Sequence, residues 1–143
     1  MGFLDSLLGG RDSPAPETPK SSGDVFAFSV TFSPVRLTAM QGGKINMIVR
    51  LTNISNEEQM ASVDVLLSRA ALIGFEPAAI NKHTEKKLGK IQPGASMEVA
   101  IPIYSTNQTK AGNYPFKVVA YAHYLDYDKV MSQKDKKGEI RVV

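Results

Sequence analysis

Apolar and polar residues alternate with a period of two along most of the chain after residue 24. Such alternation predicts β-strands that bury one face and expose the other. The segments with this pattern are 25–32, 35–40, 44–53, 62–68, 86–91, 96–103 and 114–124, and a turn at 126–128 leads to a final strand that ends in residues 139–143. Turn signals separate them at a spacing of roughly ten residues, and no long segment has a convincing helical period. The pattern therefore predicts an all-β fold, an antiparallel sandwich of two sheets.

The longest of these segments, residues 114–124, follows the turn Gly112–Asn113. Its apolar residues share one parity, whereas Tyr121 and His123 fall on the other and are expected to point away from the core. A long late strand entered by a Gly-x-Tyr step is typical of the sixth strand of an immunoglobulin-like sandwich, where a tyrosine, here Tyr114, bonds its hydroxyl to nearby backbone. We therefore expect an immunoglobulin-like antiparallel β-sandwich of about seven strands over residues 24–143, with a flexible N-terminal tail.

Two prolines refine this picture. Pro34 interrupts the first strand, which suits an edge strand that kinks or changes sheets before residues 35–40. Pro102 places its strand at an edge or at a bulge, because proline has no N–H to give to a neighbouring strand. Residues 69–84 show no clear period, so the pattern does not predict their path.

The tail divides into two parts. The first ten residues follow a helical spacing, which predicts a short amphipathic helix over residues 1–10. Its apolar face consists of Phe3, Leu4, Leu7 and Leu8. Residues 11–23 are rich in Pro, Ser and Thr and are predicted to be a linker. The apolar face is expected to dock weakly on a membrane or a partner; the alternatives are a frayed end or docking on the chain's own domain.

Composition narrows the classes of function. The 143 residues, of which 43% are apolar and 22% charged, suffice for one folded domain. The absence of cysteine excludes disulfides and thiolate chemistry and suits a reducing compartment. The net charge of +3 is scattered, so we expect no nucleic-acid partner. The sequence has no membrane-spanning run and no secretory signal pattern, so we expect a cytoplasmic protein, with weak peripheral membrane association through its N-terminus.

The sequence shows no motif for catalysis or metal binding. Its two histidines, His83 and His123, have no metal-ligand spacing to each other or to a carboxylate, and both are expected at the surface. Neither a phosphate-binding glycine loop nor a nucleophile elbow is present. We therefore expect no enzyme activity, no cofactor and no metal ion.

An immunoglobulin-like strand order brings the loops 53–58, 92–94 and 125–129 to one end. The candidate binding residues there are Glu57, Glu58, Asp126, Tyr127 and Asp128. The residues expected at the opposite end are Lys82, His83, Lys86, Lys87 and Lys110. Two ends of opposite charge orient a partner through their field, although ordinary solvated loops have the same composition. The clustered carboxylates are also ligands of the kind that Ca²⁺ takes.

A second candidate surface is the outward parity of residues 114–124. Tyr121 and His123 would form an exposed aromatic face near Tyr127. Such a face binds sugar rings or a second protein, or it lies beneath a neighbouring strand or loop.

Three motifs carry a family resemblance. They are Gly43-Lys-Ile-x-Met-x-Val-x-Leu-Thr-Asn53, Leu88-Gly-Lys-Ile-Gln-Pro-Gly-Ala-Ser96 and Ala111-Gly-Asn-Tyr-Pro-Phe-Lys-Val-Val119. Together they resemble the signatures of CARDB-type and related immunoglobulin-like domains over about residues 24–143. This resemblance implies adhesion, spacing or recognition rather than chemistry. The first ten residues are similar to the membrane-targeting tips of prokaryotic cell-division anchor proteins.

Two functions follow from these observations. The first is a non-catalytic protein-interaction module, an adaptor or scaffold with a protein partner, tethered peripherally to a membrane through its N-terminus. The second is an accessory domain that binds carbohydrate or Ca²⁺ through the loops at one end. A rise in melting temperature with sugar or Ca²⁺ would favour the second, and loss of a partner on removal of residues 1–10 would favour the first.

Overall fold

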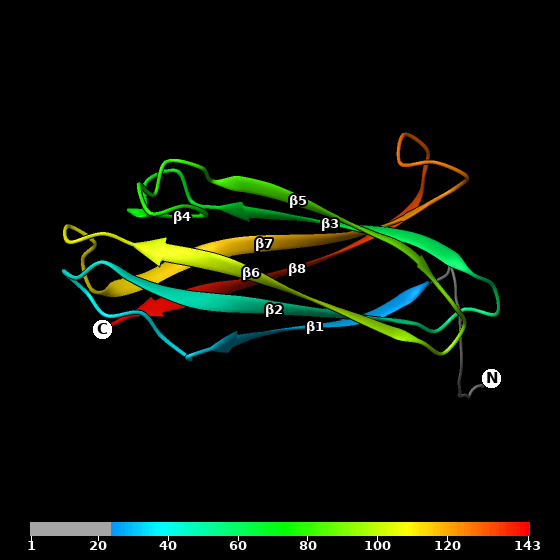
Figure 1. Cartoon of the computed structure of the whole chain (residues 1–143), viewed down its shortest axis with the longest axis horizontal. Coiled ribbons are helices and arrows are strands. Elements are labelled where there is room, and N and C mark those ends of the chain that lie inside the picture. Colours follow the sequence, from blue (N-terminus) through cyan, green and yellow to red (C-terminus); the bar gives the residue numbers. More distant parts are fainter. Residues whose placement is uncertain (1–23) are drawn as a thin grey trace, which may run out of the picture.

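The computed structural model describes residues 24–143, which form a sandwich of two antiparallel sheets (Figure 1). The first sheet contains, in spatial order, β1 (Phe26–Ser33), β2 (Gly43–Asn53), β6 (Ser96–Ser105) and β4 (Ile73–Gly74). The second contains β5 (His83–Ile91), β3 (Gln59–Leu67), β7 (Gly112–His123) and β8 (Val130–Val142). The predicted all-β antiparallel sandwich is confirmed, with eight strands in this part of the chain. The helix predicted over residues 1–10 and the linker over 11–23 lie outside the described residues.

The core lies between the sheets and is built from alternate residues of each strand. On β2, every second residue from Ile45 to Leu51 is buried, and the residues between them are exposed or half-buried. The facing strands of the second sheet contribute Val63, Val65, Phe116, Val118, Ala120 and Ile140. Burying one large aliphatic side chain stabilises the fold by about 1.5–3 kcal/mol. The period-two pattern therefore brings the two apolar faces together, as in other sandwiches.

The chain changes sheets after Pro34. β1 pairs along its whole length with β2 of the first sheet. Leu37, by contrast, bonds to β8 of the second sheet: its N–H donates to the carbonyl of Arg141 at 3.0 Å, and its own carbonyl accepts from the N–H of Val143 at 3.0 Å. The predicted change of sheets is thus confirmed.

Two further local predictions are confirmed. The hydroxyl of Tyr114 donates to the carbonyl of Lys110 at 2.5 Å, which is the corner contact expected from the Gly-x-Tyr step. Pro102 lies on β6, where within the described residues β4 pairs only with Tyr104 and Ser105. The proline therefore occupies a stretch of strand that has an open edge.

The last strand follows the predicted turn at residues 126–128 and contains the predicted final segment. β8 begins at Val130, ends at Val142 and pairs with the whole length of β7. Its parity places Lys134 and Lys136 at core-facing positions at the edge of the sheet. Their ammonium groups reach across to the first sheet, where Lys134 Nζ lies 3.1 Å from Asp24 Oδ2 and Lys136 Nζ donates to the carbonyl of Phe28 at 3.3 Å. Inward-pointing charges of this kind discourage strand pairing between molecules.

The segment between β3 and β5 wraps around Lys82. The ammonium group of Lys82 donates to three backbone carbonyls, those of Ala71, Ile73 and Ala79. Burial lowers the pKa of Lys82, and the nearby carboxylate of Glu76 partly offsets this effect. Because the ammonium group holds this loop together, Lys82 does not contribute to an exposed basic end as the sequence suggested.

Candidate functional site

The three loops predicted to share one end of the sandwich do so (Figure 1). We call this region, formed by residues 53–58, 92–94 and 124–130, the loop end. Asn53 joins two of the loops through its backbone, since its N–H donates to the carbonyl of Ala95 at 2.9 Å and its carbonyl accepts from Gly94 at 2.8 Å. The loops 53–58 and 92–94 are therefore held against each other by backbone hydrogen bonds.

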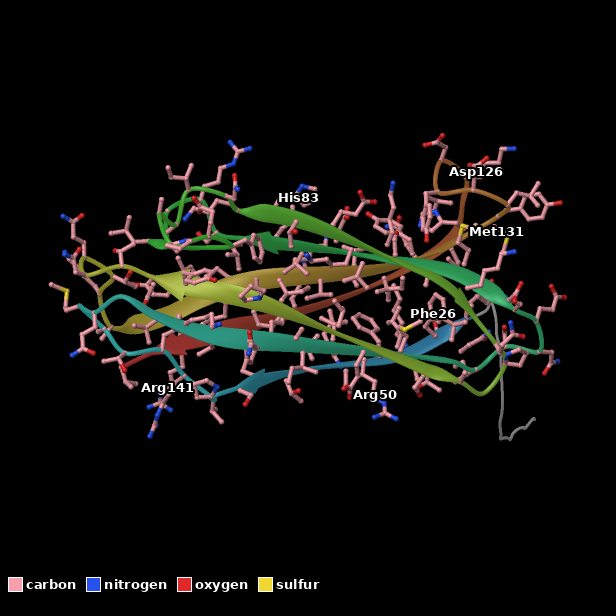
Figure 2. The ribbon with its side chains drawn as sticks, viewed as in Figure 1. Phe26, Arg50, His83, Asp126, Met131 and Arg141 are labelled. Carbon is pink, nitrogen blue, oxygen red and sulfur yellow. The ribbon has the colours of Figure 1, made fainter. Side chains whose placement is uncertain are left out.

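The β7–β8 connection is a tight loop with its own hydrogen bonds. The N–H of Tyr124 donates to the carbonyl of Lys129 at 2.8 Å, and the N–H of Asp128 donates to the Asp126 carboxylate at 3.0 Å. The Asp126 side chain thus builds the turn, which is the usual reason for aspartate at such a position. Figure 2 shows Asp126 and Met131 projecting from this hairpin, with His83 farther along the sandwich.

Large apolar side chains are exposed on this hairpin. We call them the apolar patch, which consists of Tyr124, Leu125, Val130 and Met131. Their exposed fractions are 55%, 70%, 51% and 52%. Exposed apolar residues that occur singly are ordinary, but three of these four, Tyr124, Leu125 and Met131, line one pocket, and grouped apolar residues of this kind mark an interaction surface. The sequence analysis did not predict this patch, because in this loop it considered Asp126, Tyr127 and Asp128 as the candidate binding residues and not their apolar neighbours.

A pocket of about 330 Å³ adjoins the patch. Its lining residues are Glu57, Glu58, Gln59, Met60, Lys90, His123, Tyr124, Leu125 and Met131. The predicted residues Glu57 and Glu58 thus belong to it, whereas Asp126, Tyr127 and Asp128 do not. A larger hollow of about 650 Å³ at the opposite end is lined mainly by small and polar residues, among them Gly42, Gly43 and Ser105. Of these two hollows, the one at the loop end shares its walls with the exposed apolar patch.

His123 is buried, which corrects the expectation of an exposed histidine. It does lie on the outward face of β7, but only 6% of its surface is exposed. Its Nε2 lies 2.6 Å from the hydroxyl of Ser62, and the Tyr127 ring packs against it edge-on with centroids 5.1 Å apart. Tyr127 is fixed in turn, because its hydroxyl accepts from the N–H of Gly89 at 2.9 Å. The loop folds back over the sheet, which strand parity does not reveal, and Tyr121 is left half-buried beside it.

Two β-bulges accompany this arrangement. The β3–β5 register shifts between Ala61 and Ser62, and the β7–β8 register shifts between Ala122 and His123. On β5 the irregularity contains Gly89, whose φ of 76° suits glycine. Bulges bend a strand and re-aim its side chains, so they allow the loop to reach back over the sheet. A glycine inside a strand pattern was the sequence signal for this feature.

The Ser62–His123 pair does not have the arrangement of a nucleophile and its base. Ser62 is completely buried, whereas a nucleophile must reach its substrate. The His123 Nδ1 atom has no hydrogen-bond partner among the described residues, so no group there orients the imidazole as a catalytic triad requires. The pair is a buried polar contact beneath the loop.

The carboxylates at the loop end do not assemble a cation site. Within residues 24–143, no three His, Asp or Glu side chains come together at separations that would hold a metal ion. Calcium takes six to eight oxygen ligands, and Asp126 already accepts a hydrogen bond inside its own turn.

The expected division into acidic and basic ends is also incomplete. Lys87 lies at the loop end rather than opposite to it, with its ammonium group 5.1 Å from the centre of the Tyr127 ring. Lys90 Nζ lies 3.9 Å from a carboxylate oxygen of Glu58. Lysines and carboxylates therefore mix at this end, and exposed pairs of this kind contribute little stability.

Tyr121, on the outward face of the second sheet, makes the stability of the domain depend on pH in the alkaline range. Burial raises the pKa of the Tyr121 hydroxyl above its usual 10.0, and the carboxylates of Asp64 and Glu85 raise it further. As the pH rises from about 10 toward this raised value, the unfolded chain loses a proton that the folded chain keeps, so the free energy of unfolding falls.

Tyr121→Phe removes this titration. We expect its free energy of unfolding to fall less than that of the wild type between about pH 9 and pH 11, as measured by urea denaturation. An equal fall in both proteins would contradict the assignment.

Comparisons with known proteins bear on the fold. No protein-family model matches the sequence, and no curated protein is significantly similar to it. A native fragment of Escherichia coli alpha-2-macroglobulin, from domain MG7 to the C-terminus, is 16% identical with a TM-score of 0.55 over 83% of this chain and 16% of that chain. A FixG-related protein from Vibrio parahaemolyticus is 8% identical with a TM-score of 0.52 over 84% of this chain and 98% of that chain.

These similarities identify the fold. The chain is an immunoglobulin-like β-sandwich, and at such low identity the likeness extends to the fold alone. The domain spans only a small part of the macroglobulin fragment that it matches. The CARDB resemblance remains a prediction, because no family model matches. Residues 24–143 contain no helix long and apolar enough to cross a membrane.

Proposed function

We propose that this domain is a non-catalytic protein-interaction module, an adaptor or scaffold, that binds its partner with the apolar patch at the loop end. Its N-terminal segment tethers it peripherally to a membrane on the cytoplasmic side. The observation that supports this partner site is the backbone conformation and exposure of Leu125. Its backbone has a φ of 69°, which is unfavourable for leucine, and 70% of the residue is exposed. Strain of this kind costs on the order of 1–3 kcal/mol. The exposed Leu125 side chain gains too little from burial in its own domain to offset this cost, whereas burial against a partner would offset it.

The surroundings of Leu125 fit a binding surface. Three members of the apolar patch line the pocket, where Met60 joins them and Glu57 and Lys90 form part of the polar rim. Tyrosine and methionine are enriched in interface cores, and an apolar centre within a polar rim is the usual anatomy of such sites. Met40 at the opposite end is also exposed with a positive φ, but it does not line the hollow there. We therefore place the partner at the loop end.

Leu125→Asp is expected to weaken partner binding by at least about tenfold, because a carboxylate at the centre of an apolar contact is desolvated without a counter-charge. Aspartate tolerates a positive φ, so the loop should keep its conformation. The partner is first captured with the full chain as bait and then titrated as a purified protein. Its affinity is measured for the wild type and the variant.

Val35→Asp is the matched control. Val35 is 75% exposed and lies at the opposite end of the sandwich, after β1. A partner that binds Val35→Asp normally and Leu125→Asp poorly supports the proposed surface. A partner that binds both variants normally would overturn it. A rise in melting temperature with sugars, lost in Tyr124→Ala, would instead favour the carbohydrate-binding alternative.

The membrane tether is tested separately. The full chain is expected to sediment with vesicles of phosphatidylcholine and phosphatidylglycerol, and Leu7→Asp or Leu8→Asp should abolish this sedimentation. The physical reason is that a charge on the apolar face opposes burial of that face in the membrane interface, on which the affinity of a short amphipathic segment depends. If the wild type and both variants sediment equally, the tether is wrong.

A further inference from the structure

We propose that residues 3–8 of this chain dock on the apolar patch of the same molecule. The inference deepens the proposed function and rests on it, because the segment that tethers the module would also cover the surface that binds the partner. The docking residues are Phe3, Leu4, Leu7 and Leu8, and the receiving residues are Tyr124, Leu125, Val130 and Met131. The receiving residues are between 51% and 70% exposed, and the docking residues share one face at helical spacing.

The first observation is the place where the tail joins the domain. β1 starts at the loop end, on the same side as the β7–β8 hairpin (Figure 1). The carboxylate of Asp24 lies 3.1 Å from the ammonium group of Lys134, and the carbonyl of Val25 accepts from the N–H of Ile54 at 2.9 Å. Lys134 is four residues from Val130 on β8. At a rise of about 3.3 Å per residue, the attachment point is some 13 Å from the patch along that strand.

The second observation is the length of chain available. Residues 9–23 connect the docking segment to Asp24. A chain of fifteen residues has an average end-to-end distance of about 20 Å and reaches at most about 50 Å. From Asp24, the linker must span the spacing of about 10 Å between the two sheets and the distance of some 13 Å along β8 to the patch. The average length matches this span, the condition under which a tethered group has its highest effective concentration, in the millimolar range.

The third observation is the shape of the patch. Its centre is the pocket of about 330 Å³, with Met60 and Met131 in the walls. Methionine side chains adapt to the shape of an incoming apolar group. An amphipathic turn presents residues at i and i+4 to such a groove, which is the spacing of Phe3 with Leu7 and of Leu4 with Leu8. The exposed apolar residues at the opposite end lie the length of the sandwich away from Asp24 and are the poorer site.

Docking of this kind makes partner binding and membrane binding interdependent. The same apolar face of residues 3–8 serves both the patch and the membrane, so one molecule cannot use it for both at once. Membrane attachment would therefore expose the patch to a partner, and a partner on the patch would release the tether for the membrane.

The chain contains no cysteine, so a pair of introduced cysteines reports on this contact alone. Leu8→Cys combined with Leu125→Cys is treated with a short bismaleimide, and the intramolecular product is followed by intact mass. Adding Leu4→Asp and Leu7→Asp leaves the chain length unchanged and removes the apolar face. We expect these two substitutions to slow the intramolecular reaction at least tenfold.

The matched pair is Leu8→Cys with Val35→Cys, because Val35 is as exposed as Leu125 but lies at the opposite end. Its cross-linking should be insensitive to Leu4→Asp and Leu7→Asp. Equal rates with and without the aspartates in the Leu125 pair would overturn the docking. A product found mainly as a dimer, whose formation falls on dilution, would also overturn it and identify a second copy as the occupant.

The same assay separates this inference from the proposed function. Vesicles of phosphatidylcholine and phosphatidylglycerol should slow the Leu8–Leu125 cross-link by withdrawing the segment from the patch. If the aspartates slow the reaction but vesicles do not, the docking stands and the membrane tether fails. If vesicles bind the chain but the aspartates leave the cross-linking rate unchanged, the tether stands and the docking fails.

Discussion

Asn53→Ala is expected to lower the free energy of unfolding by about 2–4 kcal/mol, because it removes several buried hydrogen bonds at once. The side-chain NH₂ group of Asn53 donates to the carbonyls of Glu57 at 2.7 Å and Ile91 at 2.8 Å. Its Oδ1 accepts from the backbone N–H of Ser55 at 2.9 Å and from the Ser55 hydroxyl at 2.7 Å. Asn53 is completely buried, so in the variant the contact with Ile91 is not replaced by bulk water.

The chain has no tryptophan, so unfolding in urea is followed by circular dichroism. Asn113→Ala is the control, because Asn113 is exposed on β7 and its replacement should change stability by less than about 0.5 kcal/mol. Hydrogen exchange should also show faster exchange at residues 54–58 in Asn53→Ala, since the side chain holds this loop against β5. A loss below 1 kcal/mol, with unchanged exchange, would show that the asparagine is not a structural centre of the loop end.

Gly74→Ala is the second substitution with a large expected effect. A methyl group on Gly74 would stand 2.6 Å from the Cα and 2.7 Å from the carbonyl carbon of Ala79, and 3.0 Å from the carbonyl oxygen of Asn81. These are backbone atoms of the loop that Lys82 holds in place, so no flexible side chain can move aside. We expect the free energy of unfolding to fall by about 2–3 kcal/mol through overpacking.

Gly42→Ala tests whether the loss at Gly74 comes from the close contact. At Gly42 the added methyl group would meet only the carbonyl oxygen of Ser105, at 4.0 Å, so near-neutral behaviour is expected. Thermal unfolding of both variants beside the wild type provides the comparison. If both alanine variants lose the same stability, a general cost of replacing glycine accounts for the effect, and the packing of the loop over β4 does not.

Local patterns were sufficient where each residue's environment depends on its own strand. The alternation from Ile45 to Leu51 predicted a buried face of β2, and Pro34 predicted the change of sheets, because both effects act through neighbouring residues and backbone geometry. The corner contact of Tyr114 was predictable for the same reason, since its partner Lys110 is four residues away. The grouping of the three loops at one end followed from the strand order.

The candidate site depended on contacts between residues far apart in sequence. His123 is buried because Tyr127 folds back and bonds to Gly89 on another strand, and a period-two pattern contains no information about what covers a face. The inward direction of the β8 lysines was not predicted, because Lys134 and Lys136 contact Asp24 and Phe28, which only the packed sandwich brings near. Asp126 was predicted as a candidate binding residue, and the fold adds that its carboxylate accepts a hydrogen bond from the N–H of Asp128 within its own turn. The sequence thus determined which faces are apolar, because side-chain direction follows from local backbone geometry. Tertiary packing decided which of those faces stay exposed, because covering a face requires a partner that only the folded chain brings near.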